Sequence, residues 1–141
     1  ISSAEQLAHV WAKEYNYKLV EQGLEEAYRL GFQTQAPIKT VYWSNGPTRL
    51  FKIGKEVIEV RHITEQKLRW IGRPEGVFLR GLTVMSPESI EIHDLQKAFK
   101  RMQLSKQEAK RIVHKLKSAL LTVAWQEKFE QLERVMIGAY S

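Results

Sequence analysis

The sequence predicts an α+β fold, in which a three-stranded antiparallel meander is packed with helices and is followed by a C-terminal helical extension. The first observation is that residues 35–62 are rich in β-branched and aromatic side chains and contain two short turns. The second is that stretches with apolar residues at helical spacing lie on both sides of this region. The third is a length of 141 residues with 43% hydrophobic content, which suits one soluble domain with its own core. We therefore expect residues 1–85 to form the α+β part and residues 86–141 to form a basic helical extension packed on it.

The chain is predicted to begin with an amphipathic helix over residues 3–15. Ser2 and Glu5 have the spacing of a capping box, in which each side chain accepts a hydrogen bond from the other residue's backbone amide. Apolar residues follow at helical spacing, and residues 17–20 are expected to be extended. A second helix starts at Gly23, and we expect a glycine at its C-terminal end to close it.

The later helices are predicted from capping residues and helix breakers. Gly72 ends a short helix, and Pro74 suits the first position of the next one. Ser105 and Glu108 form a second capping box. The predicted helices cover residues 3–15, 23–30, 65–71, 74–83, 93–102, 106–116 and 119–137.

The meander takes its register from the second of its two turns. Asn45-Gly46 is a typical turn dipeptide and is predicted to join the first two strands, while Gly54-Lys55 suits a two-residue hairpin turn. A two-residue turn at Gly54-Lys55 puts apolar side chains on one face of both strands, and we expect helices to pack on that side. The predicted pairs are Ile53 with Glu56, Phe51 with Ile58, and Arg49 with Val60.

Two residue types in and around the meander have a structural and a functional interpretation. Arg49 falls on the apolar face, where pairing with a glutamate is favoured over contact with a ligand. Trp43, Trp70 and Trp125 are interpreted as core residues rather than as a binding platform.

The positive charge of the chain is concentrated in one segment. The net charge is +6, and residues 97–117 contain eight cations and one anion, Glu108. At helical spacing the apolar residues of 106–117 occupy one arc, and cations fill most of the remainder. A phosphate backbone is the natural counter-surface for such a helix, and the scarcity of arginines favours sequence-tolerant contact. The alternative is that these cations only form a solvent-exposed face that keeps the protein soluble. The predicted nucleic-acid-binding residues are Lys100, Arg101, Lys106, Lys110, Arg111, Lys115 and Lys117.

The segment from Gln22 to Pro37, QGLEEAYRLGFQTQAP, resembles a signature of the AbiEi-type antitoxins of bacterial type IV toxin–antitoxin systems. The resemblance continues through residues 41–49 and 53–62 and covers about residues 3–85. The chain departs from the family pattern at Gln33 and at Ser44-Asn45. The residues that match the family motif include Gly31, Gln35, Pro37, Gly46, Arg49 and Gly54.

The resemblance implies a non-enzymatic antitoxin and transcriptional regulator that acts in the bacterial cytoplasm. Members of that family oppose a nucleotidyltransferase-type toxin, typically without binding it, and repress their own operon. Their usual architecture places an N-terminal winged helix before a domain of this kind. We therefore expect the chain, which begins at Ile1, to be the C-terminal domain of a longer protein.

The sequence does not support catalysis. His9, His62, His93 and His114 form no metal-binding pattern, and Asp94 is the only aspartate. The chain lacks cysteine and any Gly-rich phosphate loop, so no cofactor or metal is expected. No apolar run approaches the roughly 18 residues of a membrane span. Two other hypotheses stay open: a protein-interaction or dimerisation module, with contacts through residues such as Trp125 and Phe129, and a cryptic nuclease built on clustered glutamates.

Overall fold

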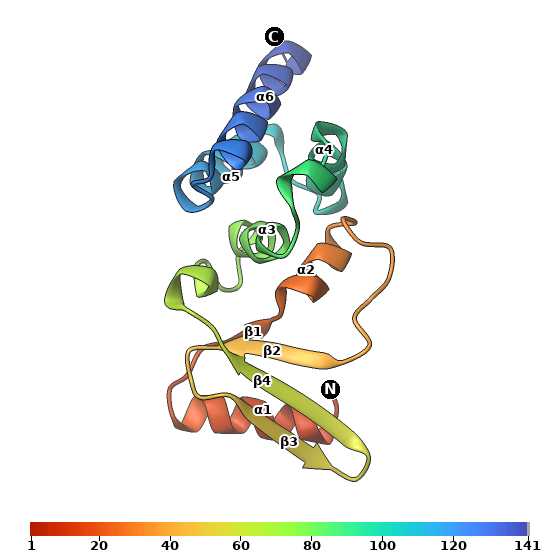
Figure 1. Ribbon diagram of the computed structural model, residues 1–141, viewed down its shortest axis with the longest axis vertical. Helices are drawn as coiled ribbons and strands as arrows, with labels where there is room; N and C mark the ends of the chain where they lie inside the picture. The colour runs from red at the N-terminus through yellow and green to blue at the C-terminus, as the bar shows by residue number, and fades with distance from the viewer. Residues whose placement is uncertain (141) are drawn as a thin grey trace.

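The computed structural model describes residues 1–140, and side chains as far as Met136. A sheet and α1 lie at one end of the molecule and a group of helices lies at the other end (Figure 1). This arrangement confirms the predicted α+β class with C-terminal helices. In chain order the elements are α1 (Ser3–Glu14), β1 (Leu19–Glu21), α2 (Gly23–Arg29), β2 (Thr40–Ser44), β3 (Arg49–Ile53), β4 (Glu56–His62), the 3-10 helix η1 (Glu65–Leu68), α3 (Pro74–Thr83), the 3-10 helix η2 (Pro87–Ser89), α4 (Ile92–Arg101), α5 (Lys106–Ala119) and α6 (Val123–Tyr140).

The strands form one mixed sheet of four strands in the order β1-β2-β4-β3. β4 lies between β2 and β3, parallel to β2 and antiparallel to β3. β1 pairs antiparallel with the other edge of β2. The predicted three-stranded antiparallel meander is therefore wrong, because β2 and β3 are not neighbours and the short segment after α1 adds a fourth strand.

The turn predicted at Asn45-Gly46 does not form a hairpin, because the polar groups of this link are engaged with other elements. The Asn45 side chain donates a hydrogen bond to Glu65 at 2.8 Å. The backbone amide of His62, at the end of β4, donates to Thr48 Oγ1 at 3.0 Å. These contacts take the chain past the C-terminal end of β4, so β3 begins on its far side.

The β3–β4 hairpin has the predicted turn and register. Gly54 has φ +62, a left-handed conformation that glycine adopts without steric cost. Phe51 and Ile58 lie opposite each other on one face, and both are buried. The confirmed pairs are Ile53 with Glu56, Phe51 with Ile58, and Arg49 with Val60.

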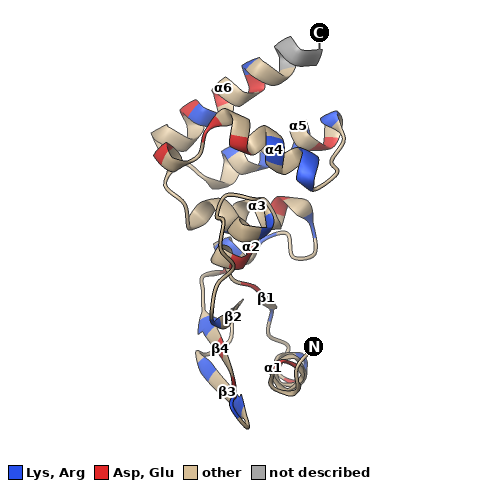
Figure 2. Ribbon diagram, turned by 90° about the vertical axis from the view of Figure 1, so that its right-hand side faces the viewer, with Lys and Arg blue, Asp and Glu red and all other residues tan. Residues whose placement is uncertain are grey.

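One face of the sheet is covered by α1 (Figure 2). Small and aromatic residues of the helix, Ala4, Ala8 and Trp11, pack with Phe51 and Ile58 of the hairpin. The Trp11 and Phe51 rings meet edge to face, with centroids 5.3 Å apart.

The expectation that helices pack on only one side of the sheet is wrong. On the opposite face Trp43 and Val41 are buried with Leu68 of η1. Gly23 at the start of α2 permits this packing, because a Cβ there would lie 2.7 Å from the Trp43 ring. The cover stops before the hairpin, where Leu50 is 51% exposed and Val57 is 48% exposed.

A second and larger core joins α2 and α3 to α4, α5 and α6. It includes Leu30, which caps the C-terminal end of α2, and Phe78 of α3, so this core crosses the expected boundary between residues 85 and 86. Trp125 and Phe129 of α6 are buried in it as a stacked pair, and Trp70 packs against it while partly buried. The interpretation of the tryptophans as core residues is thus confirmed for Trp43 and Trp125.

The capped helix ends predicted at Ser2, Ser105 and Gly31 are present, whereas the helix predicted over residues 65–71 is the 3-10 helix η1 and ends at Leu68, and the last helix begins at Val123 and not near residue 119. Ser2 accepts a hydrogen bond from the Glu5 amide at 3.2 Å, and Ser105 accepts one from the Glu108 amide at 3.1 Å. Gly31 follows α2 with φ +86, and the Phe32 amide donates back to the Ala27 carbonyl at 2.8 Å.

Candidate nucleic-acid interface

The basic segment forms α4, the turn after it and α5. Each helix buries one apolar stripe in the larger core, including Leu95 and Phe99 of α4 and Ile112 and Leu116 of α5. The remaining positions carry the charge, so the positively charged residues of 97–117 gather over α4 and α5 (Figure 2).

A hollow of about 350 Å³ lies between α4 and α5, and we call it the α4–α5 hollow. The ionisable side chains in its lining are cations or histidine: His93, Lys97, Lys100 and Lys106. The nearby acidic residues serve the helix ends, since Asp94 accepts the Glu91 amide and Glu108 accepts the Ser105 amide. The other lining residues are Gln96, Phe99, Leu104, Ser105, Ala109 and Met136.

Lys106 is the first residue of α5 and lines this hollow. Partial desolvation, together with repulsion from Lys110 one turn later, lowers the pKa of Lys106. Both causes disfavour the charged form of Lys106, and only the repulsion from Lys110 reflects neighbouring positive charge.

Lys115 is directed into the protein. Its ammonium lies 3.2 Å from Glu75 of α3, whose side chain is 3% exposed, and 5.6 Å from the centroid of the Trp70 ring. Burial opposes ionisation of Glu75, but a hydrogen bond to its own backbone amide and the contact with Lys115 together lower the pKa of Glu75. Lys115 therefore balances a buried carboxylate.

Lys117 is also paired within the helical part of the chain. Its ammonium lies 2.8 Å from a carboxylate oxygen of Glu133 on α6. The hydrogen bond to Glu133 raises the pKa of Lys117. The pair joins α5 to α6.

The other predicted residues divide between two surfaces. Lys110 and Arg111 are exposed on α5, and Lys100 is exposed on α4 at the α4–α5 hollow. Arg101 lies on another side of α4, where it lines a separate hollow with the residues that end α2. The structure thus gathers Lys100 and Lys106 at one hollow and separates Arg101, Lys115 and Lys117 from it.

The motif residues lie at turns and loops, except Arg49, which begins β3. Gly31 and Gly54 both have positive φ. Gly31 ends α2, and Gly54 lies in the hairpin turn between β3 and β4. Gly46 is buried beside Tyr17, whose ring would lie 2.6 Å from a Cβ at that position. Gln35 and Pro37 lie in the loop between α2 and β2.

Arg49 lies on the apolar face of the hairpin, as its register predicts. Its guanidinium stacks over two aromatic rings, at 4.8 Å from the Phe51 centroid and 5.6 Å from the Trp11 centroid. The favoured pairing with a glutamate is not among the described ion pairs, and the aromatic faces take its place.

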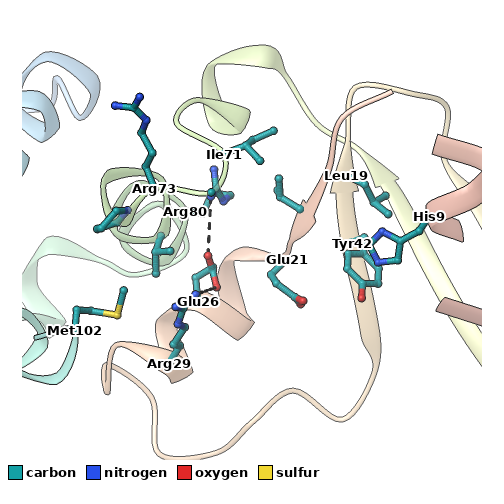
Figure 3. A pocket seen from close by; sticks show the side chains of 14 residues that line it. His9, Leu19, Glu21, Glu26, Arg29, Tyr42, Ile71, Arg73, Arg80 and Met102 are labelled. Atoms are coloured by element: carbon teal, nitrogen blue, oxygen red, sulfur yellow. Dashed lines mark ion pairs between the residues drawn. The ribbon is translucent and has the colours of Figure 1, made fainter. Parts of the chain in front are cut away.

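A larger cavity of about 510 Å³ is lined by residues of the sheet, of α2 and of α3 (Figure 3). At its helical wall Glu26 and Arg80, 3% and 2% exposed, face each other with 4.0 Å between Glu26 Oε2 and Arg80 Nη2. Arg80 also donates to the Arg69 carbonyl at 2.9 Å. Among the described residues, Glu26 Oε1 and Arg80 Nε have no hydrogen-bond partner.

The carboxylates of this cavity differ in their pKa values. Burial raises the pKa of Glu26 in spite of Arg80 and Arg29, and partial desolvation and Glu25 raise the pKa of Glu21. The arrangement links α2 to α3 through Arg80, and Glu26 takes up a proton more readily than an exposed glutamate.

Glu5 has the opposite shift. The hydroxyl of Tyr42 donates to Glu5 at 2.6 Å, and this hydrogen bond lowers the pKa of Glu5. Burial and the same hydrogen bond raise the pKa of Tyr42.

Within the described part of the chain, no group of three His, Asp or Glu side chains is placed to hold a metal ion. None of the described helices is long and apolar enough to cross a membrane.

Sequence reasoning missed the Glu26–Arg80 pair and the placement of Arg101 beside the end of α2. A signal for the first was present: Arg80 stands among Val77, Phe78 and Leu82 in a helix with apolar residues on most of its sides. An arginine in a helix of that kind is buried and needs a partner. No local pattern identifies Glu26 as that partner.

The protein-family comparison gives a match over most of the chain. Residues 1–117 match the family of unknown function DUF6088. No curated protein and no solved structure matches the chain. The matched region runs from α1 to the last turn of α5, so it contains the sheet, the Glu26–Arg80 pair and every residue that lines the α4–α5 hollow except Met136. The chain belongs to the DUF6088 family.

Proposed function

We propose that this domain contacts nucleic acid through α4 and α5, binding the phosphate backbone without strong sequence preference. The observation that carries the proposal is the α4–α5 hollow, whose ionisable lining residues are His93, Lys97, Lys100 and Lys106. Lysines that neutralise backbone phosphates release condensed counterions, which favours binding at low salt.

The exposed cations next to the hollow extend the proposed surface. Lys110 and Arg111 are exposed on α5, whereas Lys115 and Lys117 are paired with Glu75 and Glu133. We therefore assign the phosphate contact to Lys97, Lys100, Lys106, Lys110 and Arg111, and assign Lys115 and Lys117 to stability.

The wider role that we propose is that of a non-enzymatic antitoxin-type domain in a bacterial regulator. The support is the resemblance of about residues 3–85 to AbiEi-type antitoxins. In this role the protein acts in the cytoplasm, counteracts a nucleotidyltransferase-type toxin and supports repression of its own operon. Backbone contact by α4 and α5 would add affinity to a sequence-reading domain elsewhere in the protein.

The test is titration of the domain against two duplexes of equal length and unrelated sequence, at about 50 and 200 mM salt. We expect similar affinities for both duplexes at low salt and a steep loss at high salt. Absence of binding at low salt, or an affinity indifferent to salt, would remove the proposal.

A protein-interaction module is the second candidate, and the uncovered face of the hairpin favours it. Leu50 of the edge strand β3 and Val57 of the adjacent strand β4 are about half exposed there. Trp125 and Phe129, the contacts expected from the sequence, are buried and unavailable for this purpose. Light scattering of the wild type and of L50S/V57S decides the matter: a discrete oligomer that the double variant abolishes would support this function, and a monomer would oppose it.

A further inference from the structure

The hollow that Arg101 lines is found where α2 ends beside α4, and we call it the arginine hollow. It has a volume of about 390 Å³ and is lined by Tyr28, Arg29, Gly31, Gln33, Thr34 and Arg101. Five of these residues come from the end of α2 and the segment after it, and Arg101 is the last residue of α4. The fold therefore brings two arginines from distant parts of the sequence to one hollow.

The charge of this hollow is positive and poorly balanced. Arg29 has one carboxylate neighbour, Glu26 Oε1, at 4.0 Å. That carboxylate is shared with Arg80 at the same distance and is buried. Among the described side chains, Arg101 has no carboxylate within ion-pair distance. Two arginines at one hollow repel each other unless an anion lies between them.

Gly31 allows Arg101 to approach the backbone. A Cβ at Gly31 would lie 3.1 Å from Arg101 Nη1 and 3.3 Å from its Cζ. The guanidinium therefore rests against the α2 terminus, and this contact limits the conformations of a side chain that is otherwise exposed. Gln33 and Thr34, directly after this glycine, add an amide and a hydroxyl to the lining.

We propose that the arginine hollow is a binding site for a phosphate group, held between Arg29 and Arg101 with Thr34 as a further donor. Each guanidinium presents a planar fork of N–H groups that matches two oxygens of a phosphate. The lining holds no carboxylate to compete with the ligand. The proposal goes beyond the nucleic-acid contact of α4 and α5, because it uses a different hollow and gives a role to the segment that ends α2.

The first experiment is a titration with inorganic phosphate, followed by NMR of the backbone amides and the arginine side chains. We expect saturable shifts at Gly31, Gln33, Thr34 and the Arg101 Nε, absent when chloride is added to the same ionic strength. R101A and R29A should each weaken phosphate binding at least tenfold. R134A removes an exposed arginine of α6 and should leave it unchanged. Non-saturating shifts, or equal weakening by R134A, would overturn the proposal.

R101K separates a binding role from a packing role, because it keeps the charge and removes the fork. We expect it to bind phosphate more weakly than the wild type and more tightly than R101A, with an unchanged unfolding midpoint. If R101A unfolds, T34A replaces it as the test, with an expected loss of several-fold. Wild-type affinity in R101K and T34A would contradict the proposal.

Two further probes identify the source of the phosphate. A short DNA duplex that shifts the same resonances would assign the site to a nucleic-acid backbone, and adenosine monophosphate acting alone would assign it to a small phosphorylated ligand. If inorganic phosphate, the duplex and adenosine monophosphate all fail to shift these resonances, the proposed site is wrong. Loss of duplex binding in K97A/K100A with phosphate binding intact would separate this site from the α4–α5 hollow.

Discussion

Lys115 and Lys106 show how the surroundings of a lysine decide its role. Both are on α5, nine residues apart in the sequence. Lys115 lies 3.2 Å from the buried carboxylate of Glu75, whereas Lys106 lines a hollow shared with two other lysines. A lysine that balances a buried carboxylate contributes to stability, whereas a lysine that lines a hollow with other lysines adds to the positive charge of that hollow.

Replacement of Lys115 by alanine should destabilise the fold by about 1.5–3 kcal/mol. The variant leaves the Glu75 carboxylate buried without its cation, and unfolding in urea would measure the loss. K110A, which removes an exposed lysine of the same helix, is the control and should change stability by less than about 0.5 kcal/mol. Equal effects of the two variants would contradict the structural role of Lys115.

The pH dependence of stability should report the burial of Glu26. Burial raises its pKa above 4.5, the ordinary value of a glutamate, so the folded state binds a proton more tightly than the unfolded state. The stability from this proton is complete below pH 4.5 and is lost as pH rises through the folded pKa. The difference in unfolding free energy between wild type and E26Q should therefore shift in favour of the wild type as pH falls from 7 toward 4.5. A difference that shifts the other way would show that Arg80 outweighs burial.

At the residue scale, the sequence predicts interactions between near neighbours and misses those between distant residues. Ser105 and Glu108 are three residues apart, so helix geometry alone brings them into the capping box. Glu26 and Arg80 meet only after α2 packs on α3, and Arg49 stacks on Trp11 only after α1 covers the sheet. No spacing rule contains this information.

At the scale of elements, the end of α2 connects fold and proposed site. Gly31 closes the helix with φ +86 and admits Arg101 beside the backbone. Gly72 has a similar φ of +76, but a Cβ there would have no atom within 4 Å. The two glycines therefore separate the cost of a left-handed conformation from the cost of displacing Arg101.

We expect G31A and G72A each to lose about 1 kcal/mol of stability from backbone strain, measured by unfolding in urea. Only G31A should also weaken phosphate binding, because its methyl group would lie 3.1 Å from Arg101 Nη1 and would require the guanidinium to shift. If G72A weakens phosphate binding as much as G31A does, strain and not contact explains the effect.

The strands illustrate what element-level patterns can predict. The β3–β4 register followed from a two-residue turn and the alternation of apolar side chains, both of which are local. The parallel pairing of β2 with β4 joins strands that are separated in the sequence by β3. The residues of the link 45–48 are compatible with a β2–β3 hairpin as well as with the observed crossing. The hydrogen bonds of this link to Glu65 and to the His62 amide accompany the crossing. Turn residues alone therefore could not give the strand order.

At the scale of the whole molecule, the excess of positive charge is concentrated in one part of the chain, whereas the larger hydrophobic core includes residues from both parts. Cations gather on α4 and α5, while Glu5, Glu21 and Glu25 lie together near β1. The larger core nevertheless joins α2 and α3 to the basic helices. The basic surface is thus held by elements from both parts of the chain, and its concentration in residues 97–117 was evident from the sequence. The pairing of Lys115 and Lys117 was not evident from the sequence, because their partners Glu75 and Glu133 lie on α3 and α6.

The salt dependence of duplex binding tests the central claim most directly, when the wild type is compared with two double variants. K97A/K100A removes two lysines of the α4–α5 hollow and should reduce the slope of log affinity against log salt by about 2. K115A/K117A removes equal charge from paired positions and should leave that slope unchanged while the domain stays folded. Equal reductions in slope for the two double variants, or no reduction for K97A/K100A, would contradict the assignment of phosphate contact to this hollow.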